Sequence, residues 1–97
     1  MIFNFTHLTL ALVDGKVTGL PDDFPITDHE DMAFDAYDEN EQSFEGYGEI
    51  TDLHSLLWHA TEDPERDELW GLQPKRVRIA KIGADRYPED QEYELFI

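Results

Sequence analysis

The chain has 97 residues with no cysteine, and 40% of them are apolar; this predicts one folded domain and excludes disulfides, thiolate metal sites and cysteine nucleophiles. Seven Lys and Arg against 23 Asp and Glu give a formal net charge of −16, which disfavours direct binding to nucleic acid or to anionic membrane surfaces. The first residues lack the basic segment of a secretory signal, and no apolar run reaches the length of a membrane span, so we expect a cytoplasmic protein.

The first expected element is a strand over residues 2–13, which are rich in Phe, Thr, Leu and Val. Its leucines and its phenylalanines would point to opposite faces, so either both faces are covered or a bulge near residues 6–7 shifts the register. Asp14-Gly15 is a strong hairpin signal, because both central positions of a type I′ turn need positive φ. Residues 16–18 would return as the second strand.

Residues 31–50 carry the clearest alternation in the chain. Even positions are mostly apolar or glycine and odd positions are mostly acidic or tyrosine, which predicts strands with one apolar and one acidic face. The polar stretch 38–42 suits a hairpin loop of about five residues. A helix is the alternative, because Thr27 and Glu30 could form a capping box, but the apolar residues would then scatter around its axis. We therefore predict the hairpin.

One helix follows, over about residues 52–62, with Thr51 or Asp52 as its cap. The apolar residues of one helical face recur at the expected spacing: Leu53, Leu56, Leu57 and Ala60. Asp63-Pro64 resembles a cap followed by proline at the first helical position. It predicts a short helical turn over about residues 64–70, which Gly71 would end.

Residues 76–82 and 92–97 both alternate like strands. If the two strands pair, Arg76 and Arg78 could lie across from Glu92 and Glu94, with each pair worth about 0.2–1 kcal/mol. The whole pattern predicts a single acidic α+β domain over residues 1–97, with a small antiparallel sheet of about four to six strands and helical cover on one side.

The charge is unevenly distributed along the chain. Residues 22–49 contain eleven acids and no Lys or Arg, whereas residues 75–86 contain five bases and only Asp85 as an acid. General solubility does not require such segregation. We expect nearby carboxylates to neutralise the basic cluster, in preference to nucleic-acid binding by that cluster.

No motif for catalysis, cofactor binding or metal binding stands out, so we expect a non-enzymatic protein without a cofactor. Counting from Asp38, the oxygen positions of a calcium loop are partly filled, but Ser43 stands where the sharp turn needs glycine. The four histidines lack metal-ligand spacing. Trp58 and Trp70 are either interface anchors or core residues.

The acidic face of the predicted hairpin is the candidate surface for binding a basic partner. The residues expected there are Asp31, Asp35, Tyr37, Asp38, Glu39, Glu41, Glu45, Tyr47 and Glu49. Residues two apart on a strand lie about 6.6–6.8 Å apart on one face, so Asp35, Glu45 and Glu49 would form a regular anionic ladder. Neighbouring phosphates of nucleic acid are separated by a comparable few ångströms.

Three functions fit this expectation. The first is an inhibitor that mimics nucleic acid and occupies the basic groove of a DNA- or RNA-binding protein; in size and composition the chain resembles phage counter-defence products such as antirestriction and anti-CRISPR proteins. The second is an immunity protein or antitoxin that neutralises a basic toxin or nuclease, where complementary charge speeds association. The third is a small regulatory protein with a halophilic acidic surface and no dedicated anionic site.

Overall fold

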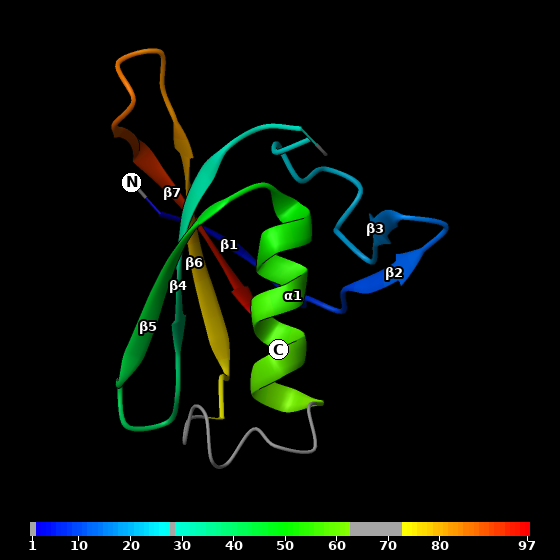
Figure 1. Ribbon diagram of the computed structural model, residues 1–97. Helices are drawn as coiled ribbons and strands as arrows, with labels where there is room; N and C mark the ends of the chain where they lie inside the picture. The colour runs from blue at the N-terminus through cyan, green and yellow to red at the C-terminus, as the bar shows by residue number, and fades with distance from the viewer. Residues whose placement is uncertain (1, 28, 63–72) are drawn as a thin grey trace.

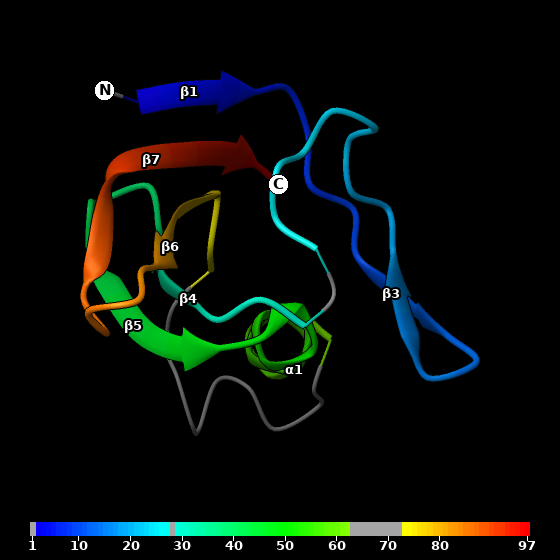
Figure 2. The ribbon, with the colours of Figure 1, turned by 90° about the horizontal axis from the view of Figure 1, so that it is seen from above.

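A computed structural model of the protein describes residues 2–27, 29–62 and 73–97. The elements are β1 (Ile2–Phe5), β2 (Ala11–Val13), β3 (Lys16–Thr18), β4 (Met32–Tyr37), β5 (Ser43–Gly48), α1 (Ile50–Thr61), β6 (Arg76–Ile82) and β7 (Pro88–Phe96). Five strands form one sheet in the order β1-β7-β6-β4-β5, and β2 and β3 form a separate two-stranded sheet. Helix α1 covers one face of the larger sheet (Figures 1 and 2). The predicted small α+β fold is confirmed.

The N-terminal segment differs from the single strand expected over residues 2–13. The chain leaves the sheet after β1, and Leu8 enters the core with 4% of its surface exposed. The Leu8 N–H donates to the Phe96 carbonyl oxygen over 2.7 Å. This hydrogen bond ties the segment between β1 and β2 to the end of β7. A single straight strand would have left one of its two apolar faces in water, and the break buries Leu8 instead.

Strand β1 also changes the character of the sheet. It pairs with β7 in parallel, whereas the pairs β4–β5, β4–β6 and β6–β7 are antiparallel. The sheet is therefore mixed, and the expectation of a purely antiparallel sheet was wrong in this respect. A parallel neighbour needs a long connection, and here the chain from β2 to β6 supplies it.

Two predicted hairpins are confirmed. In the β2–β3 turn, Asp14 and Gly15 have φ values of 51° and 78°, as a type I′ turn requires. In the β4–β5 hairpin, Met32, Phe34 and Ala36 are buried, and residues 38–42 form the loop between the strands. The glycine at position 46 is required by packing, because a Cβ there would collide with the ring of Phe34.

Helix α1 begins earlier than expected, and its cap is neither Thr51 nor Asp52. Glu49 is the N-cap, and its N–H donates to Asp52 Oδ2 over 2.8 Å. The apolar face of the helix is buried against the sheet through Ile50, Leu53, Leu57 and Ala60. The predicted turn over residues 64–70, with Trp70 and Gly71, lies outside the described residues.

The β6–β7 pair follows the expectation in part. Arg78 lies directly opposite Glu94, but Arg76 lies opposite Phe96 and Glu92 lies opposite Ala80. The arginine–glutamate contacts that involve Arg76 and Glu92 are therefore diagonal, within the reach of long side chains.

In the described ranges, no helix has the length and apolarity needed to cross a bilayer.

Candidate partner-binding face

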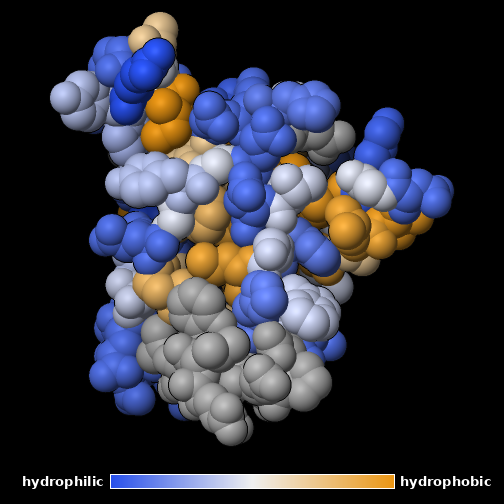
Figure 3. Space-filling view, viewed as in Figure 1, coloured by the Kyte–Doolittle hydropathy of each residue, from blue (hydrophilic) through white to orange (hydrophobic). Residues whose placement is uncertain are grey.

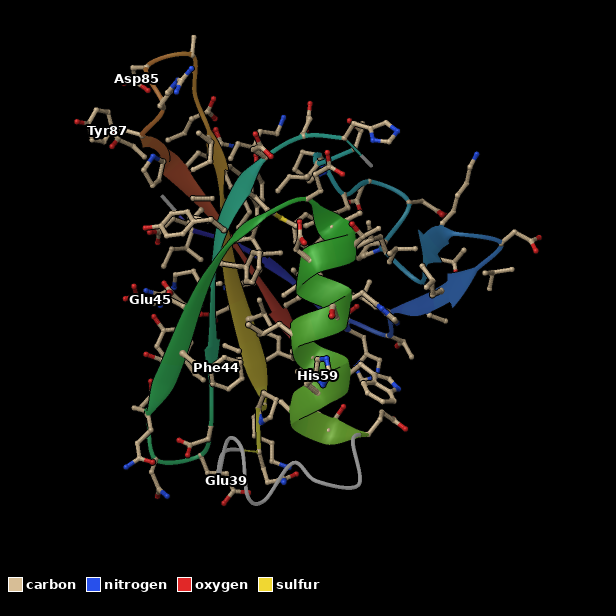
Figure 4. All side chains as sticks on the ribbon, viewed as in Figure 1. Glu39, Phe44, Glu45, His59, Asp85 and Tyr87 are labelled. Carbon is tan, nitrogen blue, oxygen red and sulfur yellow. The ribbon has the colours of Figure 1, made fainter. Side chains whose placement is uncertain are left out.

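The face of the five-stranded sheet that points away from α1 is called the outer face. Strand register arranges its side chains in rows that run across the strands from β5 to β7. The central row is Glu45, Asp35, Arg78 and Glu94; the rows beside it are Ser43, Tyr37, Arg76 and Phe96, and Tyr47, Ala33, Ala80 and Glu92. Figure 4 shows Glu45 directed away from the helix and its neighbour Phe44 directed toward it.

Two carboxylates stand side by side at the β5 end of the central row. Asp35 and Glu45 are direct partners in the antiparallel register, so their Cβ atoms are about 4.5–5.5 Å apart. Neither makes an ion pair within the part of the chain that the structure describes. Partial burial and the nearby Glu45 charge raise the pKa of Asp35 above its ordinary value of 3.8, although Arg78 opposes the shift.

The two arginines of the outer face are engaged by other carboxylates. Arg76 Nη1 donates to Glu94 Oε2 over 2.9 Å, and its Nη2 forms a short ion pair with Glu41. Arg78 lies 3.4 Å from Glu94 and 3.8 Å from Glu92. The prediction that nearby acids neutralise the basic cluster is confirmed for these two residues, and also for Lys81, which lies 3.7 Å from Glu30.

Tyrosines flank the carboxylate pair on both sides. The Arg76 guanidinium lies 4.1 Å from the centre of the Tyr37 ring, and that of Arg78 lies 5.6 Å from it. These contacts hold Tyr37 in place. Tyr47 is different, because it is 69% exposed and available to a partner.

A hollow of about 170 Å³ lies over the centre of the outer face, with Asp35, Glu45, Tyr47, Arg78, Pro88 and Glu92 among its lining residues. Three of these side chains are carboxylates and one is the arginine that β7 already engages. The hollow is therefore an anionic surface with an aromatic edge. Such a surface suits a cationic group that can also stack on a ring.

The hairpin loop holds three more of the predicted residues, each in a different role. Asp38 Oδ1 accepts hydrogen bonds from the N–H groups of Asn40 and Gln42 over 2.8 and 2.9 Å, so this carboxylate organises the loop. Glu41 pairs with Arg76. Glu39 is exposed near the tip of the hairpin (Figure 4) and is open to a partner.

Asp31 and Glu49 do not join the outer face. Asp31 precedes β4, and it lines a separate hollow together with Lys81, Arg86 and Glu89. Gly48 has a φ of 139°, which turns the chain out of the strand so that Glu49 caps α1. The expected ladder of Asp35, Glu45 and Glu49 along the strands is therefore wrong, and the carboxylates instead follow a row across strands.

The outer face includes residues that the sequence did not assign to it, namely Arg76, Arg78, Glu92 and Glu94. Their alternation was visible and predicted the β6–β7 pair. What was missing was the position of β6 beside β4, which brings these side chains next to the acidic hairpin. That pairing joins segments about forty residues apart, beyond the reach of local patterns.

Neither a metal site among the described residues nor a comparison with known proteins assigns a role to the outer face. Among the described residues, no group of three or more His, Cys, Asp or Glu side chains could hold a metal ion. The segment tested as a calcium loop, residues 38–49, follows strand β4, contains strand β5 and precedes α1, so it is not flanked by a pair of helices. Nothing matches the chain among protein-family models, curated proteins or solved structures.

Proposed function

We propose that the protein is a non-enzymatic inhibitor that mimics nucleic acid and occupies the basic groove of a DNA- or RNA-binding protein. The Asp35–Glu45 pair is the observation that carries the proposal. Two like charges directly opposite each other destabilise a sheet. Neither carboxylate forms an ion pair among the described residues, and the nearby Arg78 only partly offsets the rise in the pKa of Asp35. A cationic partner would remove that repulsion on binding.

The surroundings of the pair support the same function. Arg76 and Arg78 could have neutralised the pair, but they are engaged by Glu41, Glu92 and Glu94. The net charge of −16 adds long-range attraction for a basic groove. Nucleic-acid-binding proteins carry such grooves, and a target of this kind places the site of action in the cytoplasm.

The proposal is tested by capturing targets from a bacterial lysate on the immobilised protein and eluting with DNA or RNA at constant ionic strength. We expect nucleic-acid-binding proteins to be captured and then displaced by the oligonucleotide, because both ligands compete for one basic groove. Displacement at constant ionic strength separates competition for a site from simple charge screening. A captured protein that nucleic acid does not displace would contradict the mimic.

A matched pair of variants locates the interaction. Asp35→Asn with Glu45→Gln removes two charges from the outer face, and Asp22→Asn with Asp23→Asn removes two charges from the exposed loop before β4. We expect the first double variant to bind its target about tenfold more weakly or worse, and the second to bind nearly as the unaltered protein does. Equal effects of the two variants would mean that charge matters but the outer face does not.

An immunity protein or antitoxin is the second candidate, favoured by two exposed tyrosines. Tyr47 is 69% exposed and Tyr87 is 71% exposed, and aromatic anchors of this kind dominate many shape-specific interfaces. For this function we expect Tyr47→Ala and Tyr87→Ala to weaken binding more than the loss of Asp35 and Glu45. Nucleic acid would then fail to displace the partner.

A further inference from the structure

Strand β5 forms one edge of the five-stranded sheet. Within the described ranges it pairs with β4 on one side and with no strand on the other. It lies along the lower left margin of the molecule in Figure 1, and the surface there is largely hydrophilic (Figure 3). The backbone groups on the free side of an edge strand are a template for pairing with another chain.

The hairpin register shows which backbone groups face this free edge. The Asp38 N–H donates to the Gln42 carbonyl oxygen over 3.0 Å, so these residues form a hydrogen-bonded pair at the base of the loop. Hydrogen-bonded and non-hydrogen-bonded pairs alternate along antiparallel strands, which makes Tyr37 and Ser43 a non-hydrogen-bonded pair. In agreement, the Tyr37 carbonyl oxygen accepts from the Lys75 N–H, on the side of β6.

Every second residue of β5 therefore directs its N–H and C=O groups away from β4. These residues are Ser43, Glu45 and Tyr47, and all three are exposed. The strand runs for six residues in unbroken register with β4 and contains no proline, no lysine and no bulge. Those are the features that usually protect an edge from pairing, so the edge of β5 is open to a further strand.

Charge selects the occupant of this edge. The central row of the outer face ends here, and it runs across four strands in the order Glu94, Arg78, Asp35 and Glu45. Because Arg78 is engaged by β7, a residue opposite Glu45 on a sixth strand would adjoin two carboxylates. Arg or Lys gains attraction at that position, whereas Asp or Glu is repelled. A second copy of β5 offers no Lys or Arg and brings another net charge of −16, so the fitting occupant is a basic segment of a different protein.

We propose that β5 takes up an extended basic segment of the target as an antiparallel sixth strand, with an Arg or Lys of that segment opposite Glu45. Tyr47 is 69% exposed and lies two residues along the same face, so its ring is available to the same cation. The inference rests on the proposed inhibitor function for the nature of the target. It adds that backbone hydrogen bonds along β5, as well as charge, hold that target.

Two synthetic peptides of about seven residues, in which arginine alternates with valine and threonine, test the sixth strand. In the antiparallel register the arginine amides face β5 and the intervening amides face solvent. One peptide is N-methylated at the arginine amides and the other at the intervening amides, so the two carry equal charge and the same side chains. We expect the first to bind about tenfold more weakly or worse, because methylation removes the donors that β5 accepts from.

Amide hydrogen exchange locates the contact in the protein. With the second peptide bound, we expect the N–H groups of Ser43, Glu45 and Tyr47 to exchange about tenfold more slowly or better, because each then donates to the peptide. The N–H groups of Phe44 and Gly46 point toward β4 and should change much less. Protection restricted to alternate residues is a signature of strand pairing that attraction between charges does not produce.

Ser43→Pro with Ser43→Ala as its control tests the edge without altering any charge. Proline is tolerated on an edge strand where its nitrogen faces solvent, so the fold should be kept, as urea unfolding can establish. We expect Ser43→Pro to weaken binding of the second peptide about tenfold or more, because one edge donor is lost and the ring obstructs the approaching strand. Ser43→Ala should bind the peptide nearly as the unaltered protein does.

Three outcomes would overturn the sixth strand. They are equal binding of the two methylated peptides, unchanged exchange at Ser43, Glu45 and Tyr47 when the second peptide is bound, and no binding of that peptide up to about 1 mM. The inhibitor function fails by a different result, namely captured targets that nucleic acid does not displace. The two proposals are thereby distinguished.

Discussion

Arg78 and Asp35 are direct neighbours in the register of β6 and β4, yet the Arg78 guanidinium makes its ion pairs with β7. It lies 3.4 Å from Glu94 and 3.8 Å from Glu92. Asp35 is left beside Glu45 on the other side, and its pKa is raised. The consequences of this arrangement can be measured in the isolated protein, without knowledge of any partner.

Replacing Asp35 with Asn should stabilise the protein. The substitution keeps the shape of the side chain and removes the like-charge contact with Glu45, so we expect the free energy of unfolding near pH 7 to rise by about 0.2–1 kcal/mol. Urea denaturation measures the change, with Asp23→Asn as a control for the loss of one negative charge. If Asp35→Asn destabilises the protein, the attraction between Asp35 and Arg78 outweighs burial and the repulsion from Glu45.

The advantage of Asp35→Asn should depend on pH. Because folding raises the pKa of Asp35 above 3.8, the native state binds the proton more tightly than the unfolded state. The resulting stabilisation of the unaltered protein is fully present below pH 3.8 and is lost as the pH rises through the raised pKa. The difference in unfolding free energy between Asp35→Asn and the unaltered protein should therefore shrink as the pH falls from 7 toward 3.8.

The same pKa can be followed directly by NMR titration of the Asp35 carboxyl. Glu45→Gln should lower this pKa, because the Glu45 charge is the second cause of its elevation after burial. A pKa of Asp35 that does not respond to Glu45→Gln would show that burial alone accounts for the shift. In that case the two carboxylates interact too weakly to support the proposed function.

Arg76 should be the most sensitive charged residue of the outer face. Its side chain is only 19% exposed, contacts Glu41 and Glu94, and lies over the Tyr37 ring. We expect Arg76→Met to reduce the free energy of unfolding by about 1–3 kcal/mol, because it leaves Glu94 with a poorer partner. Arg76→Lys should recover only part of the loss, since an ammonium group neither stacks nor bonds in the same planar geometry.

Lys75 provides the control for Arg76. Its side chain is exposed, and its hydrogen bonds to Tyr37 and Ile97 are made by the backbone. Lys75→Met removes the same charge and should change the free energy of unfolding by less than about 0.5 kcal/mol. Equal losses for Lys75→Met and Arg76→Met would indicate a general effect of net charge.

The cap of α1 gives a test of the one helix boundary that differs from expectation. Asp52→Ala removes the acceptor of the Glu49 N–H bond and should cost about 0.5–2 kcal/mol of unfolding free energy, as the loss of a helix cap does. Thr51→Ala should cost less than about 0.5 kcal/mol, because Thr51 is exposed and does not cap the helix. A larger loss of unfolding free energy for Thr51→Ala than for Asp52→Ala would mean that Thr51 caps the helix.

Much of the fold could be predicted because its signals are local. Asp14-Gly15 specifies a tight turn by its backbone preference alone. The alternation from Met32 to Ile50 predicts a hairpin with a buried face, and Met32, Phe34 and Ala36 are indeed buried. The spacing of Leu53, Leu57 and Ala60 predicts the buried face of the helix. Each of these signals involves residues that are neighbours along the chain.

Local alternation was misleading at Glu49. Continued at a period of two, it assigns Glu49 to the same face as Glu45. One residue earlier, Gly48 adopts a φ of 139°, which ends the strand and makes Glu49 a helix cap. A glycine permits such a turn but does not require it. Whether the chain turns at Gly48 therefore depends on the packing of α1 against the sheet.

The sequence by itself determined the acidity and predicted most of the strands and the helix, because short-range periodicity depends only on nearby residues. Tertiary structure decided which strands became neighbours, that β1 runs parallel to β7, and that β6 lies beside β4. Those contacts depend on how distant apolar faces are buried together. In that arrangement Arg78 pairs with Glu92 and Glu94 and not with Asp35. The Asp35–Glu45 pair is therefore open to a cationic partner.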